Sequence, residues 1–203
     1  FKKFFSNFYN FFNFFMINTM TNDLKKTNLK LGIIGISNGN GHPYSWSAIF
    51  NGYEPNLMED CGFPIIPRYL EEKSFPDDCI KNAKVTHIWT QSKKISEKIA
   101  RTCYIENIVE NKLDLINKVD GVLLARDDAD NHYKFAKDFI MSGIPIYIDK
   151  PLAFNVKDAK KILNLRRYKS QIFTCSALKY ADELIPSKLD LTRIGKIKNI
   201  EAK

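Results

Sequence analysis

The sequence has few of the residues that build metal centres and disulfide frameworks. It contains four cysteines and three histidines in 203 residues. The cysteines are widely spaced without a Cys-x-x-Cys pair, and the histidines are isolated, so no metal-ligand cluster is indicated. We therefore expect a reduced, cytoplasmic and metal-free protein.

The sequence also lacks RNP-like, zinc-finger and arginine-rich patterns. Its net charge is +8, but residues 1–29 hold four lysines against one acidic residue, which leaves +5 for the remainder. That charge suits an anionic cofactor or substrate. Nucleic acid is the weaker alternative, and we expect no nucleic-acid partner.

No apolar run is long enough to span a bilayer. The first fifteen residues hold eight phenylalanines and a tyrosine, but asparagines interrupt them and no small-residue cleavage site follows. We expect no membrane partner, although a membrane-surface role is the alternative. Since the sequence begins without Met, residues 1–29 are interpreted as a dispensable leader, disordered or not natively translated, with the natural start at Met16 or Met20.

The segment Lys30–Trp46 organises the rest of the chain. Its apolar residues predict a buried strand, which runs into a loop that contains Gly35, Gly39 and Gly41. A helix is predicted to start near Pro43, because proline suits the first helical position, and its free N–H groups would face the loop. Such a corner binds phosphate, and glycine avoids a side chain that would collide with a ligand.

The loop is a variant of the dinucleotide fingerprint, which asks for glycine at three positions. Those positions hold Gly35, Ser37 and Asn40, so only the first matches, and Gly39 and Gly41 suggest one inserted residue. A glycine-rich β-turn is the alternative interpretation for the loop alone.

The chain after this first helix, which should end at Gly52, changes composition. Residues 52–84 hold four of the eight prolines and several aromatic residues. We predict an irregular insertion with one helical turn at Tyr69–Lys73. It would cover a ligand, mediate assembly or form a surface excursion held by its aromatic residues.

The next strand is predicted at Val85–Thr90, with Ser92 as the cap of a following helix. Thr90 takes the place at the strand end where such folds carry a ribose-binding acid, because Glu54 has no strand before it. The neighbouring Gln91, Ser92, Lys93 and Lys94 offer donors to a ribose 2′-phosphate, so the cofactor is NAD or NADP. The alternative is that the lysines are solvated.

Alternating strands and helices continue to about residue 176. Helices are predicted at 112–118, from His132 to Gly143 and at 155–167, and strands at 121–125, 144–148 and 171–176. This order predicts an α/β fold with a Rossmann-type doubly wound parallel sheet. The strand at 144–148 delivers Asp149, Lys150 and Pro151 to the edge where ligands bind.

The order of elements, the glycine loop, His132 and the sequence Asp149-Lys150-Pro151-Leu152 together resemble the glucose-fructose oxidoreductase and inositol dehydrogenase family. The resemblance covers roughly residues 30–203 without the insertion. In that family a Glu-Lys-Pro tripeptide ends this strand, and its lysine lies between nicotinamide and the substrate hydroxyl. Arg126-Asp127-Asp128 replaces the usual Thr-Pro-Asn.

The resemblance implies an NAD(P)-dependent oxidoreductase that acts on a sugar, inositol or related polyol, with Lys150 as the catalytic residue and the whole protein a homo-oligomer. The alternative is a non-catalytic dinucleotide sensor or scaffold. The residues expected to contact the cofactor are Gly35, Ser37, Asn38, Gly39, Asn40, Gly41, His42, Thr90, Gln91, Ser92, Lys93, Arg126, Asp127, His132, Asp149, Lys150 and Pro151.

The resemblance also divides the chain into a dinucleotide-binding domain at 30–174, with its insertion, and the truncated start of an α+β substrate and dimerisation domain at 175–203. That second domain would open with a helix at Ala181–Leu191 and a strand at Gly195–Ala202. The family's C-terminal catalytic histidine has no counterpart here, so we expect a fragment of a longer protein that binds cofactor without turnover.

Overall fold

The computed structural model describes residues 28–176, together with 192–193, 195–196 and 198–199. Six parallel strands form one sheet in the order β3-β2-β1-β4-β5-β6, which confirms the predicted Rossmann fold. The strands are β1 (Leu29–Gly35), β2 (Ala83–Thr90), β3 (Asn107–Ile108), β4 (Gly121–Leu124), β5 (Ile146–Ile148) and β6 (Ile172–Phe173). The chain reverses direction across the sheet between β1 and β4, so this is the topological switch point.

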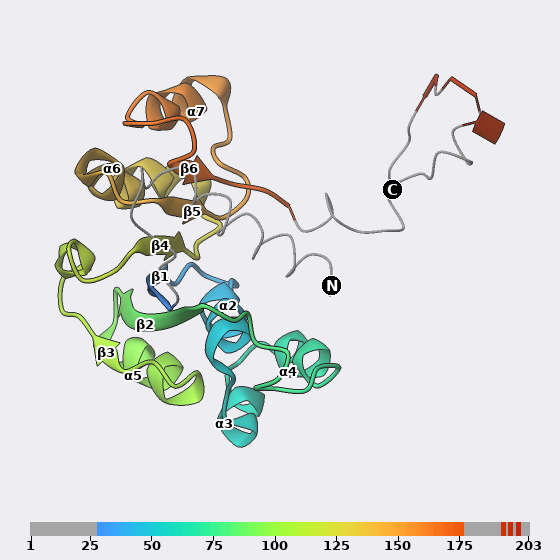
Figure 1. The fold of residues 1–203 in the computed structure, drawn as a ribbon, viewed down its shortest axis with the longest axis vertical. Coiled ribbons are helices and arrows are strands. Elements are labelled where there is room, and N and C mark those ends of the chain that lie inside the picture. The colour runs from blue at the N-terminus through green and yellow to red at the C-terminus, as the bar shows by residue number, and fades with distance from the viewer. Residues whose placement is uncertain (1–27, 177–191, 194, 197, 200–203) are drawn as a thin grey trace.

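Helices cover both faces of the sheet. They are α2 (His42–Asn51), α3 (Pro55–Glu59), α4 (Ile65–Leu70), α5 (Lys93–Thr102), α6 (His132–Ser142) and α7 (Val156–Leu163), with the 3₁₀ helices η1 (Lys112–Leu115) and η2 (Ala129–Asn131). Figure 1 shows α2 and α5 beside β1 to β3, α3 and α4 beyond α2, and α6 and α7 beside β5 and β6.

Alternating side chains of the strands supply two separate cores. Leu31 and Ile33 of β1 pack with α2 to α5 on one face, while Ile34 packs with η1, α6 and α7 on the other. All three are fully buried. Since burial of such a side chain stabilises a fold by roughly 1.5–3 kcal/mol, both faces of β1 help to hold the sheet.

Several predicted boundaries were wrong. The predicted helix at 112–118 is the short η1, since Asn117 adopts a positive φ of 68° that a helix does not tolerate. The helix predicted at 155–167 is α7, which keeps its Asn155 cap but ends at Leu163. The short strand β3 was not predicted.

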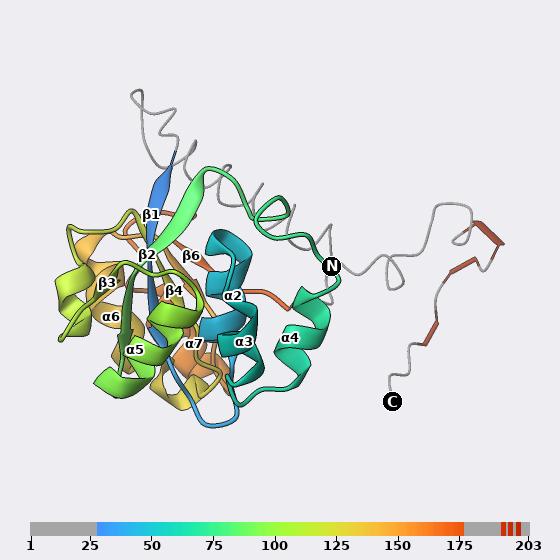
Figure 2. The ribbon, with the colours of Figure 1, turned by 90° about the horizontal axis from the view of Figure 1, so that it is seen from below.

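The segment 52–84 differs most from its prediction. It forms α3 and α4 rather than one turn at Tyr69–Lys73, and Ala83 and Lys84 already belong to β2. Met58, Ile66 and Leu70 are buried in the core on the α2 side of the sheet. The segment is thus anchored by aliphatic side chains as well as by its aromatic residues, and Figure 2 shows α3 and α4 next to α2.

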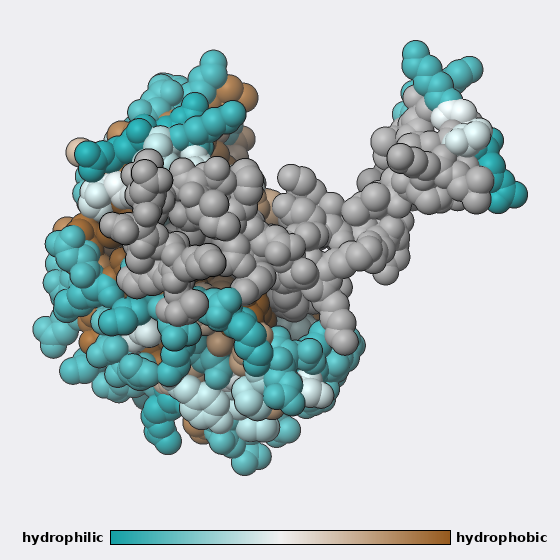
Figure 3. All heavy atoms as spheres, viewed as in Figure 1, coloured by the Kyte–Doolittle hydropathy of each residue, from teal (hydrophilic) through white to brown (hydrophobic). Residues whose placement is uncertain are grey.

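None of the helices in the described part of the chain combines the length and hydropathy needed to cross a bilayer. The face seen in Figure 3 is largely hydrophilic where residues are described. The predicted leader up to residue 27, the helix at Ala181–Leu191 and half of the predicted strand at Gly195–Ala202 lie outside the described residues.

Candidate active site

The loops that follow the parallel strands meet at the carboxyl edge of the sheet. The loop between β1 and α2, residues 36–41, projects there, as the blue segment in Figure 2 shows. It lies at the switch point, because β1 pairs with β2 on one side and with β4 on the other. This edge is where open α/β sheets bind ligands.

The glycines of this loop have different roles. A Cβ at Gly35 would lie 2.3 Å from Pro43 Cγ, and one at Gly41 would lie 2.5 Å from Ile66 Cδ1. We predicted that a side chain in this loop would collide with a ligand. At these two positions it would instead collide with neighbouring residues of the protein. Gly39 is exposed, has a φ of 76° and meets nothing within 4 Å, so it is the open glycine of the loop.

The first turn of α2 does not offer the free N–H groups that were predicted. The N–H of His42 donates to Asn40 Oδ1 (2.7 Å), Pro43 has no N–H, and that of Tyr44 donates to the Gly41 carbonyl (3.0 Å). Within the described residues, the N–H groups of Asn38 and Gly39 have no acceptor. Donors for an anion therefore come from the tip of the loop.

Polar contacts connect the loop to the ends of β2 and β4. The Ser37 hydroxyl donates to Asp127 Oδ1 (2.6 Å), and Gln91 makes two hydrogen bonds with the backbone of Ile36 (3.0 and 2.7 Å). Arg126 Nη1 donates to the Ile36 carbonyl (2.7 Å). These contacts hold the predicted site residues of three loops together without a ligand.

The guanidinium of Arg126 is almost fully occupied by the protein. It is buried, forms a two-pronged ion pair with Asp128 (2.9 and 2.6 Å) and lies 4.3 Å from the centre of the Phe135 ring. Burial would raise the pKa of the Asp128 carboxyl, but hydrogen bonds from Arg126 and Asn131 and the positive charge of Arg126 outweigh it and lower this pKa. Arg126 thus holds the loop after β1 and the loop after β4 in place.

His132 is also enclosed. It is fully buried at the start of α6, and its two ring nitrogens face the carbonyls of Arg126 (2.7 Å) and Leu152 (3.1 Å). Its ring therefore connects the loop after β4 to the loop after β5. This contact gives His132 a positioning role in the structure.

Thr90 is turned inward at the end of β2. It is buried, and its hydroxyl donates to the Ser92 carbonyl (2.7 Å) and lies 3.0 Å from Ser96 Oγ. Lys93, by contrast, is exposed at the start of α5. Lys93 rather than Thr90 is thus available to a ligand at this strand end.

A cavity of about 330 Å³ opens beside this strand end. Lys93 and Glu110 both line it, and they bring opposite charges to one small space. Glu110 was not predicted from the sequence, because the two-residue β3 that precedes it was not predicted. The short run Asn107-Ile108-Val109 before this acidic residue was the feature of the sequence that could have indicated the strand.

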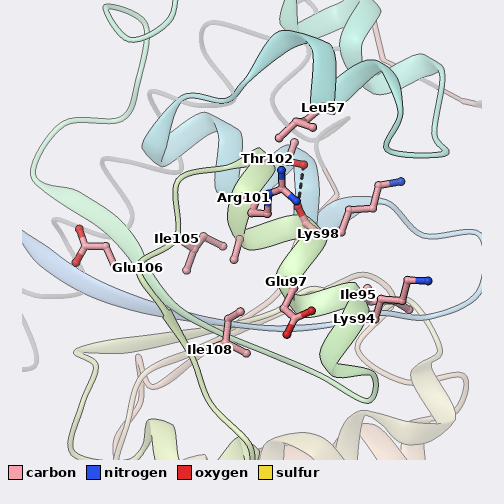
Figure 4. A pocket seen from close by; sticks show the side chains of 11 residues that line it. Leu57, Lys94, Ile95, Glu97, Lys98, Arg101, Thr102, Ile105, Glu106 and Ile108 are labelled. Carbon is pink, nitrogen blue, oxygen red and sulfur yellow. Dashed lines mark hydrogen bonds between the residues drawn. The ribbon is translucent and has the colours of Figure 1, made fainter.

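A second, larger cavity of about 690 Å³ lies on the outer side of α5. Figure 4 shows Leu57, Ile105 and Ile108 around it, with Lys94 and Lys98 at its border. Of the residues predicted to offer donors to the cofactor, only Lys94 lines this cavity, so the structure separates Lys94 from Lys93.

The end of β5 carries a buried carboxylate with three polar partners. Asp149 is 1% exposed, and its Oδ1 accepts the N–H of Lys150 (2.7 Å). Its Oδ2 lies 2.5 Å from His42 Nδ1 and accepts from Asn40 Nδ2 (3.1 Å). The Lys150 side chain, which follows directly, is exposed, as is Pro151. The carboxylate therefore joins the glycine loop to the predicted catalytic lysine.

Solved structures with the same fold include two that cover most of this chain. Myo-inositol 2-dehydrogenase from Lactobacillus plantarum matches 84% of this chain and 43% of its own, with 15% identity and a TM-score of 0.57. An oxidoreductase of the Gfo/Idh/MocA family from Vibrio cholerae matches 72% of this chain and 38% of its own, with 19% identity and a TM-score of 0.50. The chain thus spans about two fifths of the length of these proteins.

No curated protein matches the sequence. The sequence model of the Gfo/Idh/MocA family, described as an oxidoreductase family with an NAD-binding Rossmann fold, matches residues 66–176. This match starts after the glycine loop and includes the ends of β2, β4 and β5. Because it covers more than half of the 203 residues, and because the sheet has the corresponding topology, the chain belongs to this family of NAD-binding oxidoreductases.

Proposed function

We propose that this chain is the cofactor-binding part of an NAD(P)-dependent oxidoreductase that transfers hydride between a nicotinamide and a CH–OH group of a sugar, inositol or related polyol. The observation that carries the proposal is the exposed Lys150, held at the carboxyl edge of the sheet next to the buried Asp149. Family membership supports the oxidoreductase class. The polyol substrate is inferred from the family resemblance and from the inositol dehydrogenase of the same fold.

The loop after β1 fits the pyrophosphate of a dinucleotide. Gly39 leaves open space at the switch point, and the N–H groups of Asn38 and Gly39 are free of acceptors among the described residues. The Asp127 carboxylate nearby receives a hydrogen bond from the Ser37 hydroxyl, which reduces its repulsion of an anion. Residues 37–41 would therefore hold the cofactor through backbone and small polar donors.

When bound, the nicotinamide supplies the acceptor or donor of the hydride. Lys150 would donate a hydrogen bond to the reacting oxygen and stabilise the negative charge that develops on it as the hydride leaves the carbinol carbon. The hydrogen bond from the Lys150 N–H to Asp149 fixes the backbone from which this side chain extends. The chain thus contributes orientation and charge.

The first prediction tests the role of Lys150 in the natural protein that carries these 203 residues. Lys150→Met keeps the apolar stem and removes the ammonium, so it should lower the rate of hydride transfer by about 10²–10³-fold, the usual effect of losing one charge-stabilising group. Cofactor affinity should change less than threefold. The measurements are single-turnover reduction of the nicotinamide with a panel of polyols and a cofactor titration.

Lys157→Met is the matched control, because Lys157 is an exposed lysine of α7. It should leave both quantities unchanged. Equal transfer rates for wild type and Lys150→Met would remove Lys150 from the mechanism. Cofactor binding without any turnover by the wild type would favour the alternative of a non-catalytic dinucleotide sensor or scaffold.

A further inference from the structure

His42 and Asp149 form an oriented pair inside the Rossmann domain. Nδ1 of His42 lies 2.5 Å from Asp149 Oδ2, although the two residues are 107 positions apart in the chain. An ionised carboxylate only accepts hydrogen bonds, and Asp149 already accepts two others, from Asn40 Nδ2 and from the Lys150 N–H. The proton of this contact therefore sits on Nδ1 of His42.

This arrangement determines what the other ring nitrogen can do. With the proton on Nδ1, the neutral ring carries its lone pair on Nε2. No hydrogen bond to Nε2 comes from any residue of the described part of the chain. The side chain is 33% exposed although Nδ1 contacts the buried Asp149, which leaves part of the ring accessible at the carboxyl edge of the sheet.

The ring is also held in place by packing. It stacks on Trp46, one helical turn further along α2, with centroids 4.9 Å apart and planes at 14°. Trp46 in turn packs edge-on against Tyr147 of β5 (5.0 Å). A histidine whose Nδ1–H is bound by a carboxylate and whose face is packed has the orientation that a general base requires.

We propose that His42 is the catalytic proton-transfer residue of this site and that Asp149 is its positioning residue. This inference rests on the proposed function. As the substrate is oxidised, the hydroxyl proton moves to His42 Nε2, the O–H electron pair forms the second bond of the C=O group, and hydrogen leaves carbon with its electron pair as hydride to the nicotinamide. In the reverse direction His42 returns the proton to the oxygen.

The same carboxylate serves both groups. Asp149 Oδ1 accepts the N–H of Lys150 and its Oδ2 contacts the ring of His42, which anchors both residues at the end of β5. In the proposed mechanism both side chains act on the same reacting oxygen. Lys150 then stabilises charge on that oxygen, and His42 removes or supplies its proton. The site thereby contains an acid–histidine pair within the Rossmann domain itself.

The first test needs neither cofactor nor substrate. In the natural protein labelled with ¹⁵N-histidine, ring nitrogen shifts should show His42 with its proton on Nδ1 at neutral pH. Asp149→Asn should mix the two tautomers of His42 and leave the His87 signals, which belong to mid-strand β2, unchanged. A wild-type His42 with its proton on Nε2 would overturn the proposal, whether or not the variant folds.

The second test measures turnover. His42→Gln should lower the rate of hydride transfer about 10²–10³-fold with less than a threefold change in cofactor affinity. Added imidazole should raise the rate of His42→Ala at least tenfold over its rate without imidazole. It should not raise the rate of Lys150→Met. His87→Gln is the matched control and should keep the wild-type rate.

The outcomes separate the two proposals. Wild-type turnover that His42→Gln leaves unchanged would overturn the role of His42 and keep the proposed function. A loss of cofactor affinity as large as the loss of rate, without rescue by imidazole, would make His42 a cofactor ligand instead. Failure of the wild type to bind either nicotinamide cofactor would overturn the proposed function, while the tautomer measurement would still report on the pair.

Discussion

We expect Glu110 and Lys93 to bear most directly on the choice between NAD and NADP. Both line the cavity of about 330 Å³ at the end of β2, where the hydroxyl of Thr90, which also lines it, is already engaged with Ser92 and Ser96. A carboxylate disfavours a ribose 2′-phosphate and an ammonium favours it. The balance between these two charges should therefore decide the preference.

We predict that Glu110→Gln raises the affinity for NADP relative to NAD by about 3–10-fold, since the interaction between two water-exposed charges a few ångströms apart is worth about 1 kcal/mol. Lys93→Gln should shift the ratio by a similar factor toward NAD. Titration of both cofactors against each variant measures the ratio. Lys94→Gln, which lines the other cavity, is the control; an unchanged ratio in all three variants would place the ribose elsewhere.

At the scale of an element, the loop after β4 is stabilised by the ion pair between Arg126 and Asp128. The pKa of the Asp128 carboxyl is lowered in the folded protein, so this pair contributes stability at pH values above the ordinary pKa of an aspartate, about 3.9. The contribution is lost as the pH falls through the lowered pKa of the folded state.

Asp128→Asn should accordingly reduce the free energy of unfolding by about 1–2 kcal/mol at pH 7. The difference from wild type should shrink below about pH 4, where the carboxyl of the unfolded chain becomes protonated. Denaturant unfolding at several pH values measures it. Glu106→Gln, which breaks an exposed pair with Lys84, should cost less than about 1 kcal/mol; a pH-independent cost at Asp128 would contradict the ionic origin.

At the scale of the whole molecule, the segment 52–84 is part of the core on one face of the sheet. Met58 has no exposed surface and packs in the same cluster as Leu31 and Ile33. Ile65, in the same segment, is 63% exposed. Substitutions at these two positions therefore test whether the segment belongs to the core or is a loop on the surface.

Met58→Ala should lower the free energy of unfolding by about 2–5 kcal/mol, because it leaves a cavity in a packed core. Ile65→Ala should change it by less than about 0.5 kcal/mol. Thermal or denaturant unfolding of both variants measures the difference. Similar small effects at both positions would mean that the segment detaches from the domain without cost.

Local sequence patterns determined the framework of this protein. The apolar strands, the Asn155 cap, Gly143 after α6 and the placement of Asp149-Lys150-Pro151 at a strand end were all predicted, since each depends on neighbours within a few residues. The two-residue β3 was not, because so short a strand has no periodicity of its own.

The tertiary structure alone decided which distant groups meet. Asn40 and His42 contact Asp149 across 109 and 107 residues, and only the pairing of β1 with β4 and of β4 with β5 brings their loops together. The reason for glycine at position 41 likewise lies in Ile66 and Phe63 of a segment whose packing has no local signal. Propensity and periodicity act along the chain, whereas the contacts that orient a histidine on a carboxylate depend on how the layers pack.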